Sequence, residues 1–271
     1  MLGWPKARRR GGKGALFYAI VKDKMTKKVL VTGSSRGIGR AIALRLAQEG
    51  WSVILHGSHP SDALETTRAL IADSCVGSFA QPLDSLEAGH ALWSRCIAEQ
   101  GQIQALVNNA GIYQPHDFAS LAPDELAGLT ARMMGINFLA PLALTQEAAK
   151  EFAHQGGGRI VQVASRVGLK GEPGAALYAA SKAALINLVK SLAAEQAAEK
   201  VHHFAIAPGW VDTAMARDGM EDRLPTIIAS IPYGRMGSPE DCAGAVNWLL
   251  SGEADYMTGL VIDINGASYF R

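Results

Sequence analysis

Cysteine, net charge and long apolar runs are all scarce in this sequence. Its 271 residues include only three cysteines, Cys75, Cys96 and Cys242, which are far apart and outside any Cys-x-x-Cys pair. This pattern predicts neither a disulfide framework nor a zinc site, and the histidines likewise lack metal-ligand spacing. Because no stretch of roughly 18 apolar residues occurs, we expect no membrane span and a cytoplasmic protein.

The charge of the chain is nearly balanced overall but unevenly distributed. The formal net charge of +1 gives no reason to expect capture of nucleic acid or of an anionic membrane. Residues 1–24 carry seven basic groups and one acidic group, whereas the remainder carries 19 basic and 24 acidic groups. We predict that residues 1–24 form a basic, disordered extension and that residues 25–271 form one domain.

Short apolar runs alternate with segments of helical periodicity along residues 25–271. The runs lie at residues 29–31, 53–55, 105–107, 160–163, 204–206 and 260–262, with a weaker one at 78–80. The helical segments lie at residues 38–48, 86–99, 124–152, 175–199 and 240–250. Strands that are apolar throughout indicate a parallel sheet covered on both faces. We therefore predict a single α/β domain with a doubly wound, Rossmann-type sheet of seven strands, which binds ligands beyond the carboxyl ends of its strands.

A glycine-rich turn follows the first predicted strand and leads into a helix. It reads Gly33-Ser34-Ser35-Arg36-Gly37-Ile38-Gly39. Glycine allows the backbone to approach a pyrophosphate, whose charge the N–H groups at a helix N-terminus stabilise. Three glycines are a weak signal alone, but a dinucleotide-binding fold has its phosphate loop at this position. We interpret the turn as a dinucleotide-binding loop.

The end of the second predicted strand bears on the choice of dinucleotide. Residues 53–59 contain no Asp or Glu that could hold the ribose hydroxyls of NAD. Arg36, together with Ser58 and His59, is suited instead to charge-assisted hydrogen bonds with the 2′-phosphate of NADP. The sequence therefore favours NADPH.

Three residues predict a site for acid catalysis. Tyr178 and Lys182 lie one helical turn apart on one face, and Ser165 follows the fourth strong apolar run. A nearby ammonium stabilises a phenolate by on the order of a few kcal/mol, which would make Tyr178 a usable proton donor. The Ser165 hydroxyl could polarise a carbonyl. Tyr-x-x-x-Lys is common on helix surfaces, so the prediction depends on the three residues together.

The motifs, taken in order, resemble those of the short-chain dehydrogenase/reductase family. Its signature elements are a Thr-Gly-x-x-x-Gly-x-Gly loop, Asn-Asn-Ala-Gly and a Ser…Tyr-x-x-x-Lys set. The matching positions are Thr32 to Gly39, Asn108 to Gly111, Asn137, Ser165, Tyr178, Lys182, and Pro208-Gly209 with Thr213. The resemblance covers residues 26–270.

The resemblance implies a role for each matched residue. Tyr178 would be the general acid, and Lys182 would bind the nicotinamide ribose and tune Tyr178. Ser165 would orient the carbonyl, and Asn137 would support a water relay. The loop and the resemblance together predict these cofactor contacts: Gly33, Ser35, Arg36, Gly37, Ile38, Gly39, Ser58, Asn109, Gly111, Tyr178, Lys182, Pro208, Gly209, Val211 and Thr213. No metal site is expected.

Residues 207–213 and 256–266 resemble the bacterial 3-oxoacyl-acyl-carrier-protein reductases of fatty acid biosynthesis. The resemblance implies NADPH-dependent reduction of a carrier-bound 3-oxoacyl thioester by a homotetramer. The basic positions that related reductases use to dock the acidic carrier fall on Gly156 and Glu199 here, with Arg159 and Lys200 close by.

Two alternatives stay open for the function. The first is an NADP-dependent alcohol dehydrogenase or ketoreductase for a free small molecule. The second is a catalytically silent dinucleotide sensor or scaffold. The presence of Asn137, Ser165, Tyr178 and Lys182 counts against the silent protein.

Overall fold

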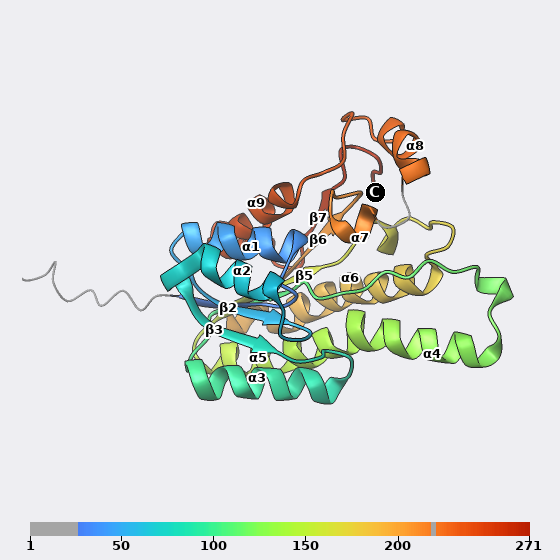
Figure 1. Ribbon diagram of the computed structural model, residues 1–271. Helices are drawn as coiled ribbons and strands as arrows, with labels where there is room; N and C mark the ends of the chain where they lie inside the picture. Colours follow the sequence, from blue (N-terminus) through green and yellow to red (C-terminus); the bar gives the residue numbers. More distant parts are fainter. Residues whose placement is uncertain (1–26, 218–220) are drawn as a thin grey trace, which may run out of the picture.

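A single parallel sheet of seven strands organises the protein (Figure 1). The computed structural model describes residues 27–217 and 221–271, so the predicted extension, residues 1–24, lies outside the described residues. The strand order is β3-β2-β1-β4-β5-β6-β7. The strands are β1 (Lys28–Val31), β2 (Ser52–Gly57), β3 (Cys75–Ala80), β4 (Ala105–Asn108), β5 (Gly158–Val163), β6 (Val201–Pro208) and β7 (Val261–Ile264). The predicted doubly wound, seven-stranded parallel sheet is confirmed, including its weakest strand.

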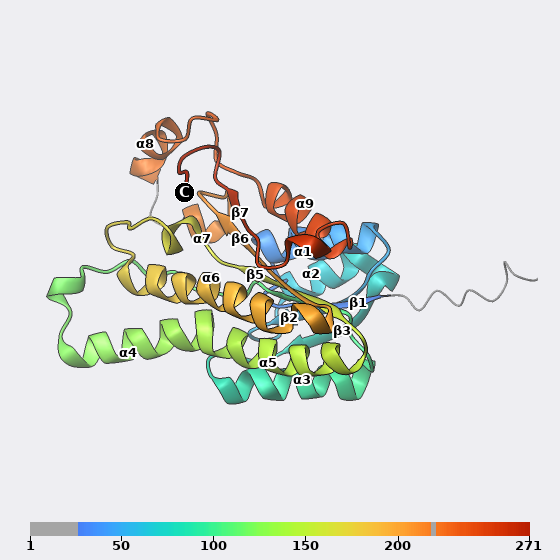
Figure 2. The same ribbon diagram turned by 180° about the vertical axis from the view of Figure 1, so that it is seen from behind.

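Helices cover both faces of the sheet, with α1, α2 and α9 on one face and α3, α5 and α6 on the other (Figures 1 and 2). Their bounds are α1 (Gly37–Gln48), α2 (Asp62–Ile71), α3 (Leu86–Gln100), α4 (Pro123–Met134), α5 (Ala140–His154), α6 (Ala176–Gln196), α7 (Ala214–Arg217), α8 (Leu224–Ala229) and α9 (Pro239–Leu250). The sequence analysis missed α2. Only Leu64, Thr67 and Ile71 of that helix are buried, which leaves a weak periodic signal.

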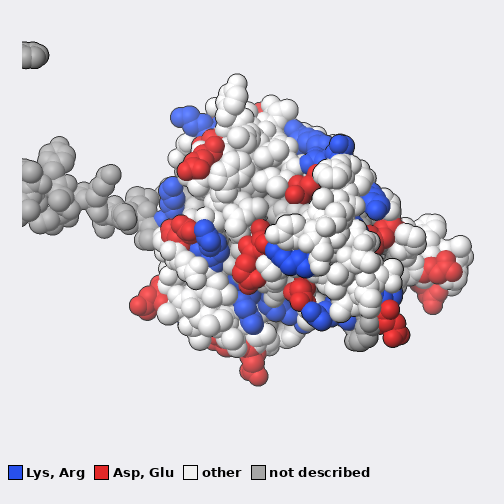
Figure 3. All heavy atoms as spheres, turned by 90° about the horizontal axis from the view of Figure 1, so that it is seen from above, with Lys and Arg blue, Asp and Glu red and all other residues white. Residues whose placement is uncertain are grey.

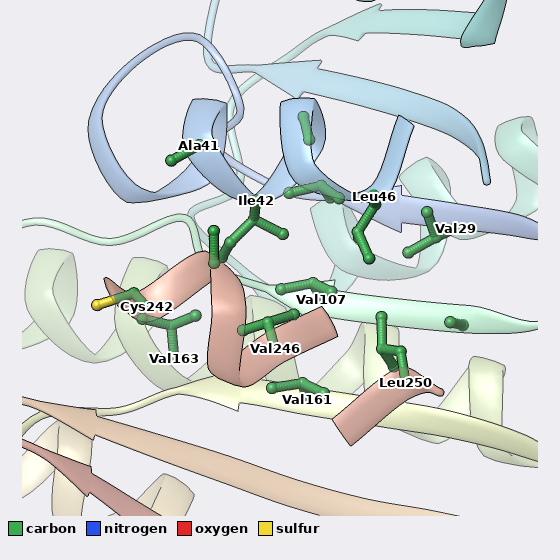
Figure 4. Packing of buried hydrophobic residues seen from close by; sticks show 14 of the residues in the cluster. Val29, Ala41, Ile42, Leu46, Val107, Val161, Val163, Cys242, Val246 and Leu250 are labelled. Atoms are coloured by element: carbon green, nitrogen blue, oxygen red, sulfur yellow. The ribbon is translucent and has the colours of Figure 1, made fainter. Parts of the chain in front are cut away.

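The core on one face is formed where α1 and α9 pack together over the sheet (Figure 4). Ile42 of α1 and Val246 of α9 are fully buried there, together with Val107 of β4. On the opposite face, the rings of Trp93 and Phe152 meet edge to face, with their centroids 5.9 Å apart. Apolar side chains of the helices therefore cover both faces of the sheet, as a parallel sheet requires.

One long helical stretch, Pro123–His154, is apolar and long enough to cross a membrane by length and composition. Its second half is α5, which packs against α3 and the strands β4 and β5. The buried side chains of α5 include Leu144, Ala148 and Phe152. The second half of the stretch is therefore a core helix against the sheet, and a π turn over Gly135–Leu139 joins it to α4, in which only Met133 is buried.

Glycine is required where the π turn meets the loop after β3. A Cβ added to Gly135 would lie 2.1 Å from the carbonyl oxygen of Asp84, so the two backbones could not keep their present distance. Gly128 lies in α4, and a Cβ added there meets nothing within 4 Å. Gly135 is thus packed against the backbone of another loop, whereas Gly128 of the same helical stretch faces open space.

We predict that Gly135→Ala destabilises the protein by roughly 1–3 kcal/mol or more, because the added methyl overpacks a backbone contact. Gly128→Ala should instead stabilise it by roughly 0.5–1 kcal/mol, because alanine loses less backbone entropy in a helix. Urea unfolding of the two variants beside the unchanged protein measures both effects. Equal stability of the two variants would contradict the packing described for Gly135.

Candidate active site

A cavity of about 600 Å³ lies at the carboxyl ends of the strands, lined by loops that follow β1 to β6. It brings together nearly all of the residues that the sequence analysis singled out. Those that line it are Gly33, Ser35, Arg36, Gly37, Ile38, Gly39, Ser58, Asn109, Gly111, Ser165, Tyr178, Lys182, Pro208, Gly209, Val211 and Thr213. Asn137 is fully buried and does not line the cavity.

The glycine-rich loop between β1 and α1 has the form that a pyrophosphate needs. Gly33 and Gly37 have φ angles of +64° and +55°, in the left-handed region that glycine adopts without strain. A Cβ on Gly39 would lie 2.2 Å from the carbonyl oxygen of Gly33. No side chain caps the N-terminus of α1, and its first turn holds no acidic residue. This end of α1 therefore suits an anion.

Asn109 and Thr32 hold the glycine-rich loop against the end of β4. The side-chain amide of Asn109 donates to the carbonyl oxygens of Thr32, at 2.9 Å, and Gly33, at 3.1 Å. In return, the Thr32 hydroxyl accepts hydrogen bonds from the backbone N–H groups of Asn109 and Ala110. The amide nitrogen of Asn109 is thus committed to the protein, where it fixes the position of the glycine-rich loop.

His56, at the end of β2, is a site residue that the sequence analysis did not identify. Its Nδ1 accepts a hydrogen bond from the backbone N–H of Gly33 at 3.2 Å, so the ring proton is on Nε2. Nε2 donates to the carbonyl oxygen of Gln81 at 3.0 Å. Burial lowers the pKa of His56 to about 4, which keeps the ring neutral near pH 7. A single histidine within a predicted strand gives no sequence signal for its hydrogen bonds to Gly33 and Gln81.

Arg36 is a cation in the part of the cavity that the loops after β1 and β2 line, and Asp84 lines the cavity from the loop after β3. Arg36 is exposed, and its guanidinium makes no hydrogen bond or ion pair with the described part of the chain. The neighbouring Arg40 is instead held by the hydroxyl of Thr67 and the carbonyl oxygen of Ala63, each at 2.9 Å. Ser58 is also exposed and lines the cavity. These residues fit a phosphate group better than the hydroxyls of a ribose.

Tyr178, Ser165 and Lys182 lie together on the opposite wall. Ser165 follows β5 and accepts a hydrogen bond from the backbone N–H of Val167 at 3.4 Å. Tyr178 lies in the first turn of α6, and Lys182 lies one turn later. The Lys182 ammonium donates to the carbonyl oxygen of Val163 at 2.9 Å and lies 5.7 Å from the centroid of the Tyr178 ring. The predicted group is therefore assembled in space.

Burial controls the protonation of this pair. It raises the pKa of Tyr178 to about 12, although a hydrogen bond with Ser165 opposes the shift. It also lowers the pKa of Lys182 to about 8. Loss of water around the phenol is the largest cause of the shift, and it disfavours the phenolate. Tyr178 is consequently a neutral phenol, which has a proton to give. Stabilisation of the phenolate by the Lys182 ammonium stays a prediction.

Asn137 lies in the π turn, a type of helix defect that is frequent at functional sites. Its Oδ1 accepts a hydrogen bond from the backbone N–H of Ile112 at 2.8 Å, and its Nδ2 donates to the Ile112 carbonyl oxygen at 3.0 Å. Nδ2 also lies 3.3 Å from the hydroxyl of Ser181 on α6. Asn137 thus joins the loop after β4 to the helix of Tyr178, and its part in a water relay stays a prediction.

The loop after β6 closes the site opposite the glycine-rich loop. A Cβ on Gly37 would lie 3.3 Å from the methyl group of Thr213, so the two loops touch. A Cβ on Gly209 would lie 2.9 Å from the Cβ of Asn265, which explains why this position needs glycine. Pro208, Gly209, Val211 and Thr213 line the same cavity as Tyr178, and their contacts with a nicotinamide stay a prediction.

The buried, neutral His56 predicts a loss of stability in acid. Its pKa falls from 6.5 in the unfolded chain to about 4 in the folded protein, so the unfolded chain binds more protons between these values. The stability from His56 is therefore complete above pH 6.5 and is lost as the pH falls towards 4. Compared with His56→Gln, the unchanged protein should lose about 3 kcal/mol more over this interval.

Urea unfolding at a series of pH values measures that difference. His59→Gln, which alters an exposed histidine three residues along the chain, is the matched control and should keep the pH dependence of the unchanged protein. The same pH dependence in the unchanged protein and His56→Gln would refute the assignment.

Comparisons with known proteins agree with this geometry. Residues 27–224 match the family described as short chain dehydrogenase. The chain is 36% identical over 255 residues to a 3alpha-hydroxysteroid dehydrogenase of Mediterraneibacter gnavus, covering 93% of this chain and 99% of that protein. It is 35% identical over 249 residues to the 3-oxoacyl-[acyl-carrier-protein] reductase FabG of Staphylococcus aureus, covering 91% of this chain and 99% of that protein.

A solved structure gives the same result for the fold. The crystal structure of a 3-oxoacyl (acyl-carrier-protein) reductase from Agrobacterium tumefaciens with NADP bound matches with a TM-score of 0.81 and 30% identity. The match covers 91% of this chain and 99% of that one. Sequence, fold and the residues gathered around the cavity therefore agree: the chain belongs to the short-chain dehydrogenase/reductase family and is an NAD(P)-dependent oxidoreductase.

Proposed function

We propose that the protein reduces the 3-oxo group of an acyl thioester, using NADPH and the proton of Tyr178. The observation that carries this proposal is the placement of Tyr178, Ser165 and Lys182 together in the wall of the cavity. A reduction needs a proton donor at this place, whereas oxidation of an alcohol needs a base, and one tyrosine can serve in either direction. The proposed direction, reduction, follows from the similarity to the 3-oxoacyl reductases.

Ser165 and Tyr178 would act on the oxygen of the reacting carbonyl, and Lys182 would act on Tyr178. NADPH supplies the hydride when it is bound. The Ser165 hydroxyl donates a hydrogen bond to the carbonyl oxygen and holds it beside Tyr178. As negative charge grows on that oxygen, Tyr178 donates its proton and becomes a phenolate. The Lys182 ammonium, which is largely protonated at pH 7, offsets the new charge in a site of low dielectric.

The residues near β2 support NADPH over NADH as the reductant. Arg36 would hold the 2′-phosphate through charge-assisted hydrogen bonds, with the exposed hydroxyl of Ser58 beside it. The uncapped N-terminus of α1 would hold the pyrophosphate. Lys182 would bind the nicotinamide ribose, and the loop of Gly209 and Thr213 would contact the nicotinamide.

The 3-oxoacyl substrate is supported by the relatives and by the wall of the cavity. Trp210, Val211 and Met215 line the cavity and offer an apolar surface to an acyl chain. The family resemblance extends the proposal to a carrier-bound thioester, to fatty acid biosynthesis in the cytoplasm and to a homotetramer packed through the helices of Asn137 and Tyr178. Partly exposed leucines on α6, Leu188 and Leu192, are consistent with such packing.

Docking of an acidic carrier has less support. Arg159, next to one expected docking position, donates two hydrogen bonds of 2.8 Å to Asp255 and is already paired. The face seen from the side of α8 and α9 shows basic and acidic side chains interspersed, without a continuous basic patch among the described residues (Figure 3). A small thioester is therefore a better substrate for a first activity assay than a carrier-bound thioester.

A free alcohol or ketone is the second candidate substrate. The 36% identity to a 3alpha-hydroxysteroid dehydrogenase favours it specifically, because that similarity spans 93% of the chain. The same Tyr178, Ser165 and Lys182 would act on such a molecule. A silent sensor or scaffold is disfavoured, because it would not need a buried lysine beside a tyrosine and a serine in the cavity wall.

We predict that Tyr178→Phe lowers kcat roughly 100- to 10,000-fold while NADPH still binds, because the variant loses only its proton donor. The measurement is the loss of reduced nicotinamide absorbance with a 3-oxoacyl thioester. Tyr113→Phe is the matched control, since the Tyr113 ring meets that of Tyr178 edge to face at 5.2 Å, and it should retain most of the rate. Equal losses in both variants would contradict the assigned acid.

We predict that Arg36→Ala raises the KM for NADPH roughly 10- to 100-fold and leaves the KM for NADH nearly unchanged. Initial rates with each cofactor at a fixed substrate concentration measure the change. Arg45→Ala removes an exposed arginine that pairs with Glu49 in the last turn of the same helix, and it should change neither constant. A parallel increase with both cofactors would show that Arg36 does not select the 2′-phosphate.

A further inference from the structure

The C-terminal tail, residues 265–271, follows β7 and returns to the part of the chain that carries Ser165. That part, the Ser165 turn (residues 165–169), lies between β5 and α6, and the side chain of Ser165 caps it. Arg166 follows Ser165 directly, is buried and lines the cavity. One nitrogen of its guanidinium, Nη1, donates to the Ser268 hydroxyl at 2.9 Å. The start of the Ser165 turn is therefore bonded to a residue of the tail, 102 positions along the chain.

The tail also holds the end of the Ser165 turn. The Tyr269 hydroxyl donates to the carbonyl oxygen of Leu169 at 3.4 Å. The turn packs against α6 as well, because a Cβ added to Gly168 would lie 2.8 Å from the carbonyl carbon of Lys182. The Ser165 turn is thus in contact with the tail and with the helix that carries Tyr178 and Lys182, and the mechanism above uses neither contact of the tail.

The backbone of the tail is strained just before the two residues that contact the Ser165 turn. Gly266 and Ala267 have φ angles of +58° and +66°, in the left-handed region. Glycine adopts this region freely, whereas the Cβ of an alanine there comes too close to the backbone. The N–H of Ser268 donates to the carbonyl oxygen of Asn265 at 3.1 Å, which closes a tight turn over the two left-handed residues. A strained conformation that directs Ser268 to its partner points to a role for that residue.

We propose that the tail, through Ser268 and Tyr269, positions the Ser165 hydroxyl for the reaction. The inference rests on the proposed function, in which Ser165 holds the oxygen of the reacting carbonyl beside Tyr178. Because Arg166 is joined to Ser165 by a single peptide bond, movement of the arginine displaces the serine. A displacement of about 1 Å in a reacting geometry can lower a rate about 100-fold. The tail therefore affects the rate although Ser268 does not line the cavity.

Arg166 keeps an ion pair when Ser268 is changed. Its Nη2 donates to the Glu172 carboxylate at 2.8 Å, so the charge of the guanidinium stays compensated in a Ser268→Ala variant. That variant loses one hydrogen bond, and the Nη1 group has to move to find another acceptor, because a buried donor without a partner is costly. The expected effect is displacement of the Ser165 turn within a folded protein.

The test uses the full chain with NADPH and two compounds, the N-acetylcysteamine thioester of 3-oxobutanoate and a plain ketone of similar size. Ser268→Ala should lower kcat for whichever compound is reduced faster by roughly 5- to 100-fold. The KM for NADPH should stay nearly unchanged, because Ser268 makes no hydrogen bond with the residues proposed to hold the cofactor. Ser251→Ala is the matched control. It removes another serine hydroxyl, which donates to the carbonyl oxygen of Trp248 at 2.7 Å away from the cavity, and should leave kcat unchanged.

A double-mutant cycle with Ser165→Ala separates positioning from a general loss of stability. If Ser268 acts through the Ser165 hydroxyl, the loss caused by Ser268→Ala should shrink to less than about threefold when Ser165 is already alanine. The same fold loss in both backgrounds would overturn the inference, as would an unchanged kcat in Ser268→Ala alone. If Ser268→Ala does not fold, Tyr269→Phe takes its place in the cycle and is judged by the same outcomes.

Failure of the proposed function gives a different result. In that case the unchanged protein would reduce neither compound, or Ser165→Ala alone would leave kcat unchanged. Either result would overturn the proposed function and the inference with it. A large loss in Ser165→Ala, together with an equal effect of Ser268→Ala in both backgrounds, would overturn the inference alone and leave a structural role for the tail.

Discussion

Burial of hydrogen-bonding groups at the carboxyl edge of the sheet is the constraint on which the site depends. Each buried polar group there has lost water and must find a partner within the protein. Thr32, Asn109 and His56 satisfy this requirement by bonding to the backbone of the first two loops. These pairings are specific in donor and acceptor, so they also determine where the loops lie. The cavity owes its shape to them.

The same loss of water sets the chemistry. Burial opposes charge on both members of the central pair, so the pKa of Tyr178 rises to about 12 and that of Lys182 falls to about 8. The two shifts have opposite effects on the proposed reduction. The raised pKa keeps Tyr178, the proposed acid, protonated. The lowered pKa of Lys182 reduces the fraction of the ammonium form that would stabilise the phenolate. The Lys182 bond to the carbonyl oxygen of Val163 partly satisfies the ammonium and keeps it beside the ring.

The sequence predicted the fold well because its signals were strong in the core. Strand runs such as residues 105–107 are fully buried, and a buried parallel strand leaves an unbroken apolar run. The helix α2 was missed because it buries one narrow stripe. Its buried positions include a threonine, Thr67, which weakens the pattern of apolar spacing further.

The sequence predicted those parts of the candidate site that depend on a special backbone conformation or on two residues at a fixed spacing. The glycines of the first loop and the Tyr178–Lys182 spacing are of this kind. His56 and Arg166 were not found, because each depends on partners that folding brings from distant parts of the chain. His56 bonds to residues 23 and 25 positions away, and Arg166 to one 102 positions away. No local pattern records such contacts.

In this cavity, the residues that would select the substrate differ from those that would catalyse the reaction. Tyr178, Ser165 and Lys182 would act on the oxygen of any suitably placed carbonyl, which is consistent with relatives described as acting on a hydroxysteroid and on a 3-oxoacyl group. What distinguishes substrates must therefore lie beyond that oxygen. Arg166 and Glu172 are two charged residues of the cavity wall, and they pair with each other at 2.8 Å, so their charges largely cancel and leave little net charge to select a charged substrate.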